Sequence, residues 1–272
     1  MKLLAMDLDG TTVNRQGHLG EKTKMALTKA RSQGHRVVFA TGRRDIDMFS
    51  FWPESRYADY LLLNNGGKLI RTADNAVLFN RTILPEPARA LIQRCLEENW
   101  QLHVISGDYW GVNKWNDGLQ DYIDYLGTAP VRYHRLTQTP WQSVEGFMAT
   151  ADRMPICEWI TQQALPLSFA PSEDNCTDIM AQNISKWNGL QRLMALLGIP
   201  ADQVIAAGDY TNDLPMIQGA GIGVAVANAL PEVKDAADYV TERDCDHDAA
   251  AEIIERFILG GEKHGTGVFY GN

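Results

Sequence analysis

Short apolar runs, each stopped by polar residues or glycine, recur along the first 80 residues of the chain. Residues 3–6, 37–40 and 60–63 are uniformly apolar, and runs of this length are typical of buried parallel strands. Between the first two, residues 20–31 carry the lysine-rich pattern of a helix, and Gly34 fits a helix C-terminal cap. The order strand, helix, strand predicts a βαβ unit and a parallel sheet.

The third apolar run ends at Asn64-Asn65-Gly66-Gly67, a turn signal that predicts a hairpin through residues 69–70 and 77–79. The pattern of short apolar runs returns after residue 200. It predicts further strands at 204–207, 222–226 and 239–240, and helices at 212–218, 231–236 and 249–259.

The middle of the chain is less uniform. Residues 144–150 and 176–181 mix apolar and polar positions, as strands with one exposed face do, and helices are predicted at 86–99, 119–126 and 154–164. We therefore expect an α/β fold with two parts. Residues 1–82 and 182–272 form a parallel-sheet core, and residues 83–181 form an inserted α+β domain.

Composition narrows the class of protein. The 272 residues carry a net charge of −9, which argues against nucleic-acid or anionic-membrane binding, since both need basic patches. The apolar start ends at Asp7, too early for a signal peptide, and no apolar stretch approaches the length of a membrane span. The four cysteines lie far apart, outside any metal-like spacing. We expect a soluble, cytoplasmic protein that is a monomer or a homodimer.

The predicted insertion holds most of the negative charge. It carries six basic and thirteen acidic residues, a net charge of −7, and five of the seven tryptophans. The tryptophans are expected to pack a small core or a dimer face. Alternatively, Trp110 and Trp115 belong to an aromatic lid that stacks on a sugar.

Acidic and hydroxyl side chains stand where the predicted core strands end. Asp7 and Asp9 follow the first strand, Thr41 follows the second, and Asp209 and Asp213 follow the strand at 204–207. The carboxyl ends of parallel strands converge on one crevice, which is the usual ligand site. Clustered carboxylates repel one another, and a hard cation such as Mg²⁺ removes that repulsion.

Each of these features has an ordinary structural explanation when it is taken alone. Asp7-Leu8-Asp9 fits a strand end with two solvated acids, Thr41-Gly42 fits a helix N-cap, Gly208-Asp209 fits a capped helix start, and Lys186 fits a solvated helix face. The turn at Gly10-Thr11 could also present backbone N–H groups to a phosphate. The combination is a much more specific indication of a functional site, because the segments occur in order and each lies at a predicted junction between elements.

Together these segments resemble the motifs of the haloacid dehalogenase superfamily of phosphotransferases. The four matching segments are Asp7-Leu8-Asp9-Gly10-Thr11, Ala40-Thr41-Gly42-Arg43, Ser185-Lys186 and Gly208-Asp209-Tyr210-Thr211-Asn212-Asp213. Asn65-Gly66 and residues 223–229 and 233–238 are similar to the Cof-type subfamily, which has a large inserted cap. The resemblance implies a Rossmann-like core with an α+β cap. Thr12 and Tyr210 depart from the family pattern, where a Leu and a small residue are common.

The resemblance also implies roles for the residues. Asp7 would attack phosphorus and Asp9 would act as acid and then base. Mg²⁺ would be held by the Asp7 carboxylate, the Asp9 carbonyl and Asp209, supported by Asp213. Phosphate or substrate would contact Gly10, Thr41, Gly42, Arg43, Asn65, Lys186 and Asn212, although Arg43 could instead pair with Asp45 or Asp47.

Three functions are compatible with these segments. The first is a Mg²⁺-dependent phosphatase acting on a small, otherwise weakly charged phosphate ester, for which we expect a sugar phosphate. The second is a phosphomutase on the same scaffold. The third is a non-catalytic phospho-switch of the response-regulator type, which is disfavoured because the strand ending at Leu63 leads to Asn64-Asn65 and not to an Asp.

Overall fold

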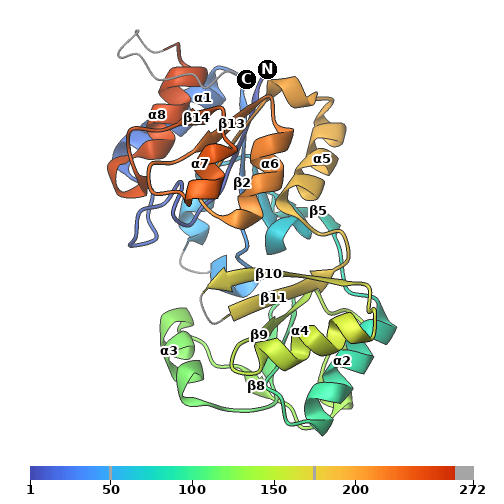
Figure 1. Ribbon diagram of the computed structural model, residues 1–272. Coiled ribbons are helices and arrows are strands. Elements are labelled where there is room, and N and C mark those ends of the chain that lie inside the picture. Colours follow the sequence, from blue (N-terminus) through green and yellow to red (C-terminus); the bar gives the residue numbers. More distant parts are fainter. Residues whose placement is uncertain (49–50, 174–175, 261–272) are drawn as a thin grey trace. The chain divides into compact units, whose positions relative to one another are not determined.

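The computed structural model describes residues 1–48, 51–173 and 176–260, and the chain divides into two compact units (Figure 1). The first unit comprises Met1–Thr41, Ser50–Phe79 and Ser185–Asn272, and the second comprises Gly42–Phe49 and Asn80–Ile184. The α/β fold predicted from the sequence is confirmed. One difference is that the second unit also takes in residues 42–49, which the sequence pattern placed with the core. The functional labels of core and cap remain predictions.

An eight-stranded sheet in the order β14-β13-β12-β1-β2-β3-β4-β5 forms the centre of the first unit. The strands from β14 to β3 pair in parallel, and β4 pairs with β3 antiparallel. The strand bounds are β1 Leu3–Met6, β2 Arg36–Ala40, β3 Tyr60–Leu63, β4 Lys68–Arg71, β5 Ala76–Asn80, β12 Val204–Gly208, β13 Ile222–Ala225 and β14 Tyr239–Val240. The central strand β1 is buried along its whole length, as its unbroken apolar run requires.

Helices cover both faces of this sheet (Figure 1). Helices α5 (Lys186–Leu197) and α6 (Leu214–Gly219) pack on one face through Leu190, Leu193 and Met216. Helices α1 (Glu21–Ser32) and α8 (Ala249–Phe257) contact each other on the opposite face. The short helix α7 spans Pro231–Asp235.

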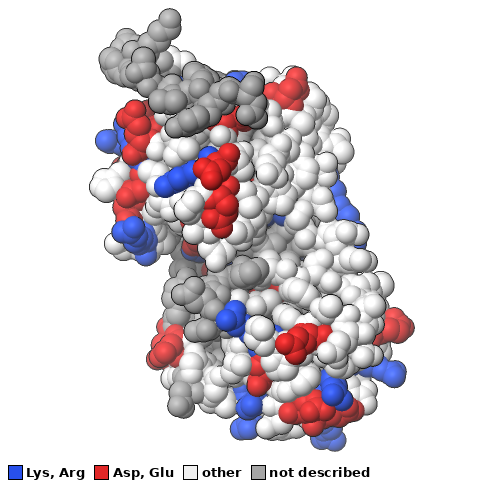
Figure 2. Space-filling view, in the orientation of Figure 1, with Lys and Arg blue, Asp and Glu red and all other residues white. Residues whose placement is uncertain are grey.

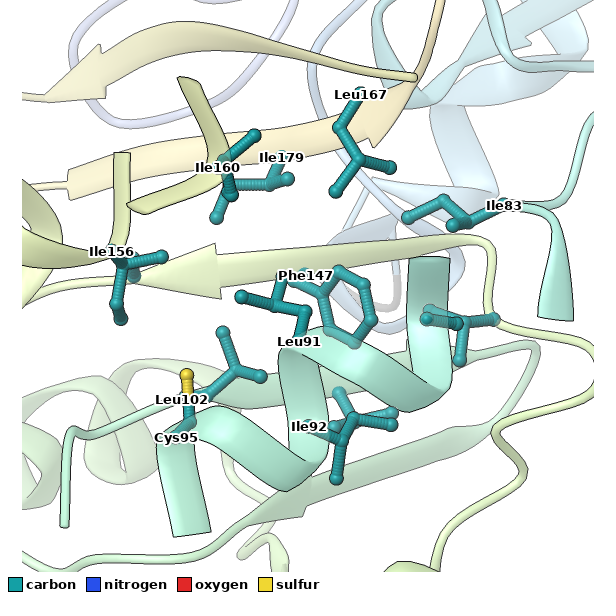
Figure 3. Packing of buried hydrophobic residues seen from close by; sticks show 14 of the residues in the cluster. Ile83, Leu91, Ile92, Cys95, Leu102, Phe147, Ile156, Ile160, Leu167 and Ile179 are labelled. Atoms are coloured by element: carbon teal, nitrogen blue, oxygen red, sulfur yellow. The ribbon is translucent and has the colours of Figure 1, made fainter. Parts of the chain in front are cut away.

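The second unit is built on a six-stranded sheet in the order β10-β11-β9-β6-β7-β8. Neighbouring strands of this sheet pair antiparallel, except that β7 and β8 pair in parallel. The strand bounds are β6 His103–Ser106, β7 Tyr109–Val112, β8 Val131–Arg132, β9 Gly146–Ala149, β10 Leu167–Glu173 and β11 Cys176–Ala181. Helices α2 (Pro85–Glu97) and α4 (Arg153–Gln162) close one face over a core that includes Leu91, Phe147 and Ile160 (Figure 3).

The opposite face of this sheet holds a smaller apolar cluster under helix α3 (Asp117–Leu126). Trp110 is 3% exposed and packs there with Ile105 and Met148. The Trp110 indole N–H donates to Nδ1 of buried His103 at 3.0 Å. Trp110 is therefore a core residue, and the sugar-stacking role considered for it is wrong. Trp115 is 42% exposed.

A buried polar network ties residues 42–49 into the second unit. The Arg44 guanidinium donates from Nε to Asp47 at 2.6 Å and from another nitrogen to the Tyr122 hydroxyl. The Tyr122 hydroxyl donates to the second Asp47 oxygen at 2.6 Å, and Asp178 lies 4.0 Å from Arg44. Burial by itself raises the pKa of Asp47, but Arg44 outweighs it and holds the pKa below its usual range. A buried ion pair of this kind is strongly destabilising to break.

Acidification is expected to weaken the second unit through His103. Burial, with a smaller contribution from the Arg44 charge, lowers the pKa of His103 to about 3, whereas an unfolded histidine titrates near 6.5. Below pH 6.5 His103 therefore becomes protonated in the unfolded chain but stays neutral in the folded chain. The free energy of unfolding consequently decreases as the pH is lowered. Between pH 7 and pH 5 the loss amounts to about 2 kcal/mol.

Urea unfolding at the two pH values tests this expectation. His103→Gln keeps an acceptor for Trp110 but cannot titrate, so its stability should depend less on pH by that amount. His134→Gln, at an exposed position, should behave as the wild type does. An unchanged pH dependence in His103→Gln would show that the protonation of other groups governs acid sensitivity.

Acidic and basic side chains occur in small, separate groups on the face of the second unit seen in Figure 2, with uncharged surface between them. On that face the negative charge of the insertion does not form one continuous patch. Within the described ranges, no helix combines the length and the apolar character that crossing a membrane requires.

Candidate active site

Two neighbouring strands of the first unit end at the acidic residues of the site. Leu3–Met6 pairs in register with Val204–Ala207, so Asp7 and Asp209 follow adjacent strands. The Asp7 backbone N–H donates to the carbonyl of Ala207 at 3.0 Å. One carboxylate oxygen from each of Asp7, Asp209 and Asp213 can be chosen so that all three lie within 4.8 Å of one another. The structure therefore brings together three of the predicted metal-site residues.

Lys186 lies between two of these carboxylates. Its ammonium donates to Asp7 Oδ1 and to Asp213 Oδ1, each at 2.6 Å, and its side chain is 1% exposed. Lys186 is the first residue of helix α5, whose N-cap Ser185 accepts a hydrogen bond from Asn188 N–H. The helix start thus fixes the lysine against the strand ends. A solvated helix-face position, the alternative considered for Lys186, is excluded.

Burial and charge together shift the pKa values of the cluster. Burial raises the pKa of Asp7 well above its usual range; Lys186 opposes this rise, and the carboxylates of Asp213, Asp209 and Asp9 add to it. Burial, followed by Asp213, raises the pKa of Asp209 to about 6. Burial by itself lowers the pKa of Lys186, but Asp213 and Asp7 outweigh it and raise that pKa. The cluster thus has more negative than positive charge.

Asp213 organises the loop that carries Asp209. Its Oδ2 accepts from the backbone N–H groups of Asp209 and Tyr210 at 3.0 and 3.2 Å, while Oδ1 accepts from Lys186. Residues Thr211–Asp213 form a 3₁₀ turn, and helix α6 begins at Leu214, two residues later than predicted. Pro215 explains the difference, because proline is accommodated in the first turn of a helix.

The loop after β1 is tightened around the acids. Gly10 has φ +77°, and a Cβ there would lie 2.3 Å from Asp209 Oδ2, so only glycine fits. The Thr11 hydroxyl donates to Asp209 Oδ1 at 3.0 Å, and the Thr12 hydroxyl donates to the Asp7 carbonyl at 2.5 Å. Asp9 is exposed and raises the pKa of Asp7, which requires the two carboxylates to be near each other.

Thr41 and the predicted amide residues lie on the neighbouring strand ends. Thr41 is buried, its N–H donates to Leu62, and its carbonyl accepts from the Asn65 N–H at 3.0 Å. The Asn212 side chain donates to Asn65 Oδ1 at 2.9 Å, joining the loop after β3 to the loop after β12. Gly66 packs against the Ser185 carbonyl, where a Cβ would lie only 2.1 Å away.

Gly42 and Arg43 differ from the other predicted residues. They follow Thr41 directly along the chain but belong to the second compact unit. Their part in phosphate binding stays a prediction.

The donor set fits a hard divalent cation. All candidate ligands are oxygens, and Mg²⁺ prefers carboxylate, carbonyl and water oxygens. Burial and the neighbouring carboxylates raise the pKa values of Asp7 and Asp209, and a bound cation would offset both effects by stabilising the ionised carboxylates. Asp213 already uses both oxygens on Lys186 and backbone N–H groups, so its contribution to a metal site is indirect.

Three supporting residues were given no side-chain role by the sequence, although Thr11 and Asn228 lie in segments that resemble the family. Thr11 and Thr12 orient Asp209 and Asp7, and the Asn228 side chain donates to the Gly10 carbonyl at 2.7 Å. The run of two threonines directly after the acidic motif is a signal for the first two, because hydroxyls commonly bond nearby backbone at turns. Asn228 lies 218 residues from Gly10, and the resemblance of residues 223–229 to the family does not indicate this contact.

The fold and this group of residues define a hydrolase of the phosphatase class. Residues 4–254 match the family described as haloacid dehalogenase-like hydrolase. Because that match covers most of the sequence, the chain belongs to this family.

Several known proteins are similar to the chain. An HMP-PP phosphatase from Cronobacter sakazakii is 28% identical over 85% of this chain and 86% of its own length. The 5-amino-6-(5-phospho-D-ribitylamino)uracil phosphatase YcsE from Bacillus subtilis is 27% identical over 95% and 96%. The crystal structure of a haloacid dehalogenase-like hydrolase from Bacteroides thetaiotaomicron superposes with a TM-score of 0.83 at 27% identity, covering 94% of this chain and 98% of that one.

Proposed function

We propose that the protein is a Mg²⁺-dependent phosphatase that hydrolyses a small phosphorylated metabolite through an aspartyl-phosphate intermediate. The observation that carries the proposal is the buried Lys186 ammonium, which bonds both Asp7 and Asp213 at 2.6 Å. A fixed cation beside a candidate nucleophile supplies the electrostatic stabilisation that phosphoryl transfer needs.

Two steps complete the reaction. The Asp7 carboxylate forms a bond to phosphorus while the ester P–O bond breaks, and Asp9 gives its proton to the leaving oxygen. Water then attacks the acyl phosphate, Asp9 takes a proton from that water, and inorganic phosphate leaves as Asp7 is regenerated. Thr41 and Lys186 hold the phosphoryl oxygens throughout. The same Asp9 carboxyl thus ends the cycle in its starting state.

A bound Mg²⁺ would be held by the Asp7 carboxylate, the Asp9 carbonyl and Asp209. When bound, it supplies positive charge that keeps Asp7 ionised and neutralises phosphoryl oxygens. Thr11 positions Asp209 through its hydroxyl. Asp213 keeps the Asp209 loop and Lys186 in place.

For the substrate we propose a sugar phosphate. The relatives described above are named as phosphatases, and one of them acts on a compound with a phosphoribityl group. We further propose that the second unit serves as the cap and determines which substrate is accepted. The motif residues of the first unit contact only the phosphoryl group, so they cannot distinguish one phosphate ester from another.

Phosphate release from a panel of sugar phosphates, pyridoxal phosphate and nucleotides tests the function. We expect Mg²⁺-dependent release from sugar phosphates. Interconversion of phosphate isomers without free phosphate would instead identify a phosphomutase. No turnover of any phosphate ester with Mg²⁺ present would overturn the proposal.

Asp209→Asn is expected to raise the Mg²⁺ concentration for half-maximal activity by at least about tenfold, because it removes one charged ligand. A Mg²⁺ titration of activity after treatment with EDTA measures this shift. Asp202→Asn, at an exposed position in the same unit, is the matched control. An unchanged Mg²⁺ requirement in Asp209→Asn would show that Asp209 is not a ligand of the metal.

A further inference from the structure

The side chain of Asn228 joins two backbone segments that are far apart in the sequence. Asn228 lies between β13 and α7, and its carboxamide donates to the Gly10 carbonyl at 2.7 Å and accepts from the Cys245 N–H at 3.0 Å. Each end of the amide thus meets a complementary backbone group. The residue is exposed, and water can satisfy an exposed amide. Two contacts to backbone therefore indicate that Asn228 holds a segment in place.

Gly10 is the residue for which such a contact matters most. Its backbone lies in the left-handed region, with φ +77°, and glycine has no side chain that could anchor it and more conformational freedom than any other residue. The hydrogen bond from Asn228 fixes the Gly10 carbonyl. Because a peptide unit is planar, it thereby fixes the orientation of the whole peptide between Gly10 and Thr11.

Two groups proposed to hold the metal lie on either side of Gly10. The Asp9 carbonyl belongs to the peptide directly before Gly10. The Thr11 hydroxyl, directly after it, donates to Asp209 Oδ1 at 3.0 Å. Gly10 itself packs against Asp209, since a Cβ would lie 2.3 Å from Oδ2. A rotation of the backbone at Gly10 would therefore move the Asp9 carbonyl relative to Asp209.

The segment that carries Asn228 also contacts the loop after β12. The Leu230 N–H donates to the Asp209 carbonyl at 3.0 Å, and the Val226 N–H donates to the Gly208 carbonyl at 3.3 Å. Residues 226–230 thus contact both loops that carry proposed metal ligands. The contacts of Leu230 and Val226 are made by the backbone, so they remain when the side chain of Asn228 is replaced. A substitution of Asn228 therefore releases Gly10 while this hold on the Asp209 loop is kept.

We propose that Asn228 is a positioning residue of the metal site, which sets the affinity for Mg²⁺ by holding Gly10 and, through it, the Asp9 carbonyl and Asp209. In this role Asn228 acts through Gly10 and is not itself a ligand. The proposal rests on the phosphatase function above, and it adds a residue to which that function assigns no part.

Asn228→Ala tests the proposal, because it removes both contacts and adds no charge. Mg²⁺ is titrated in two ways: against the melting temperature of the metal-free protein, which a bound ion raises, and against phosphate release after treatment with EDTA. We expect the Mg²⁺ concentration at the midpoint of each titration to rise about tenfold, a loss typical of residues that orient metal ligands. At saturating Mg²⁺, KM for the phosphate ester should stay close to the wild-type value.

Asn75→Ala, the same change at an exposed position between β4 and β5, should leave both midpoints unchanged. If Asn228 has only a structural role, Asn228→Ala will lower the melting temperature of the metal-free protein without moving either Mg²⁺ midpoint, and that result would overturn the proposal. The thermal titration needs no turnover, so it tests Asn228 even where no ester is hydrolysed. A wild-type protein that neither releases phosphate nor gains stability from Mg²⁺ would instead overturn the proposed function itself.

Discussion

Asp7→Asn is expected to reduce kcat for phosphate release by at least about 10⁴-fold, because the amide cannot form the acyl phosphate and the loss of a nucleophile removes most of the catalysis. Its effect on stability should be small or favourable. Lys186 still bonds Asp213 at 2.6 Å, and one of the repelling carboxylates of the cluster is gone. The variant is therefore expected to lose activity while it remains folded.

Phosphate release and thermal unfolding of the same preparation provide the measurement. Asp202→Asn removes an exposed carboxylate from the same unit and should change neither property. Retention of more than a few per cent of the wild-type kcat in Asp7→Asn would show that another group attacks phosphorus.

Lys186→Met is expected to lower both stability and activity. It leaves the buried Asp7 and Asp213 without their shared cation, and removing one partner of a buried ion pair costs about 3–5 kcal/mol. Loss of one donor to the developing phosphoryl charge should reduce kcat by about 10²–10³-fold. Urea unfolding and phosphate release measure the two effects, and Lys22→Met at an exposed position is the control.

The double variant Lys186→Met/Asp213→Asn separates the two roles of the lysine. Removing the second charge should restore part of the stability, because fewer carboxylates then repel one another, but it should not restore activity. Unfolding of Lys186→Met at the wild-type urea concentration would show that Lys186 does not balance the charge of the cluster.

The local sequence predicts the centre of the first unit well because strands β1, β3 and β12 are buried along their whole length. An unbroken apolar run ending in Asp7 or Asp209 indicates both the strand and the position of the acid. The helix at Lys186 is equally clear, because Ser185 is a strong N-cap. These signals lie within a few residues of the groups that they position.

The second unit is harder to predict. Strands β6 and β7 form a hairpin around Gly107-Asp108, with Ser106 opposite Tyr109, but polar residues interrupt their apolar pattern. The contact between Arg44 and Tyr122 spans 78 residues, and no local pattern reports it. The burial of Trp110 depends on α3 covering its face of the sheet, which is a tertiary effect.

The second unit consists of two separate segments of the chain, residues 42–49 and residues 80–184. It is therefore not a single continuous insertion with one linker at each end. A chimera that exchanged only residues 80–184 with a relative would remove Tyr122 and Asp178 while leaving Arg44 and Asp47 behind. Since these four residues form one buried network, both segments have to be inherited, or engineered, together. The modular boundary therefore begins immediately after Thr41, a residue proposed to hold the phosphate.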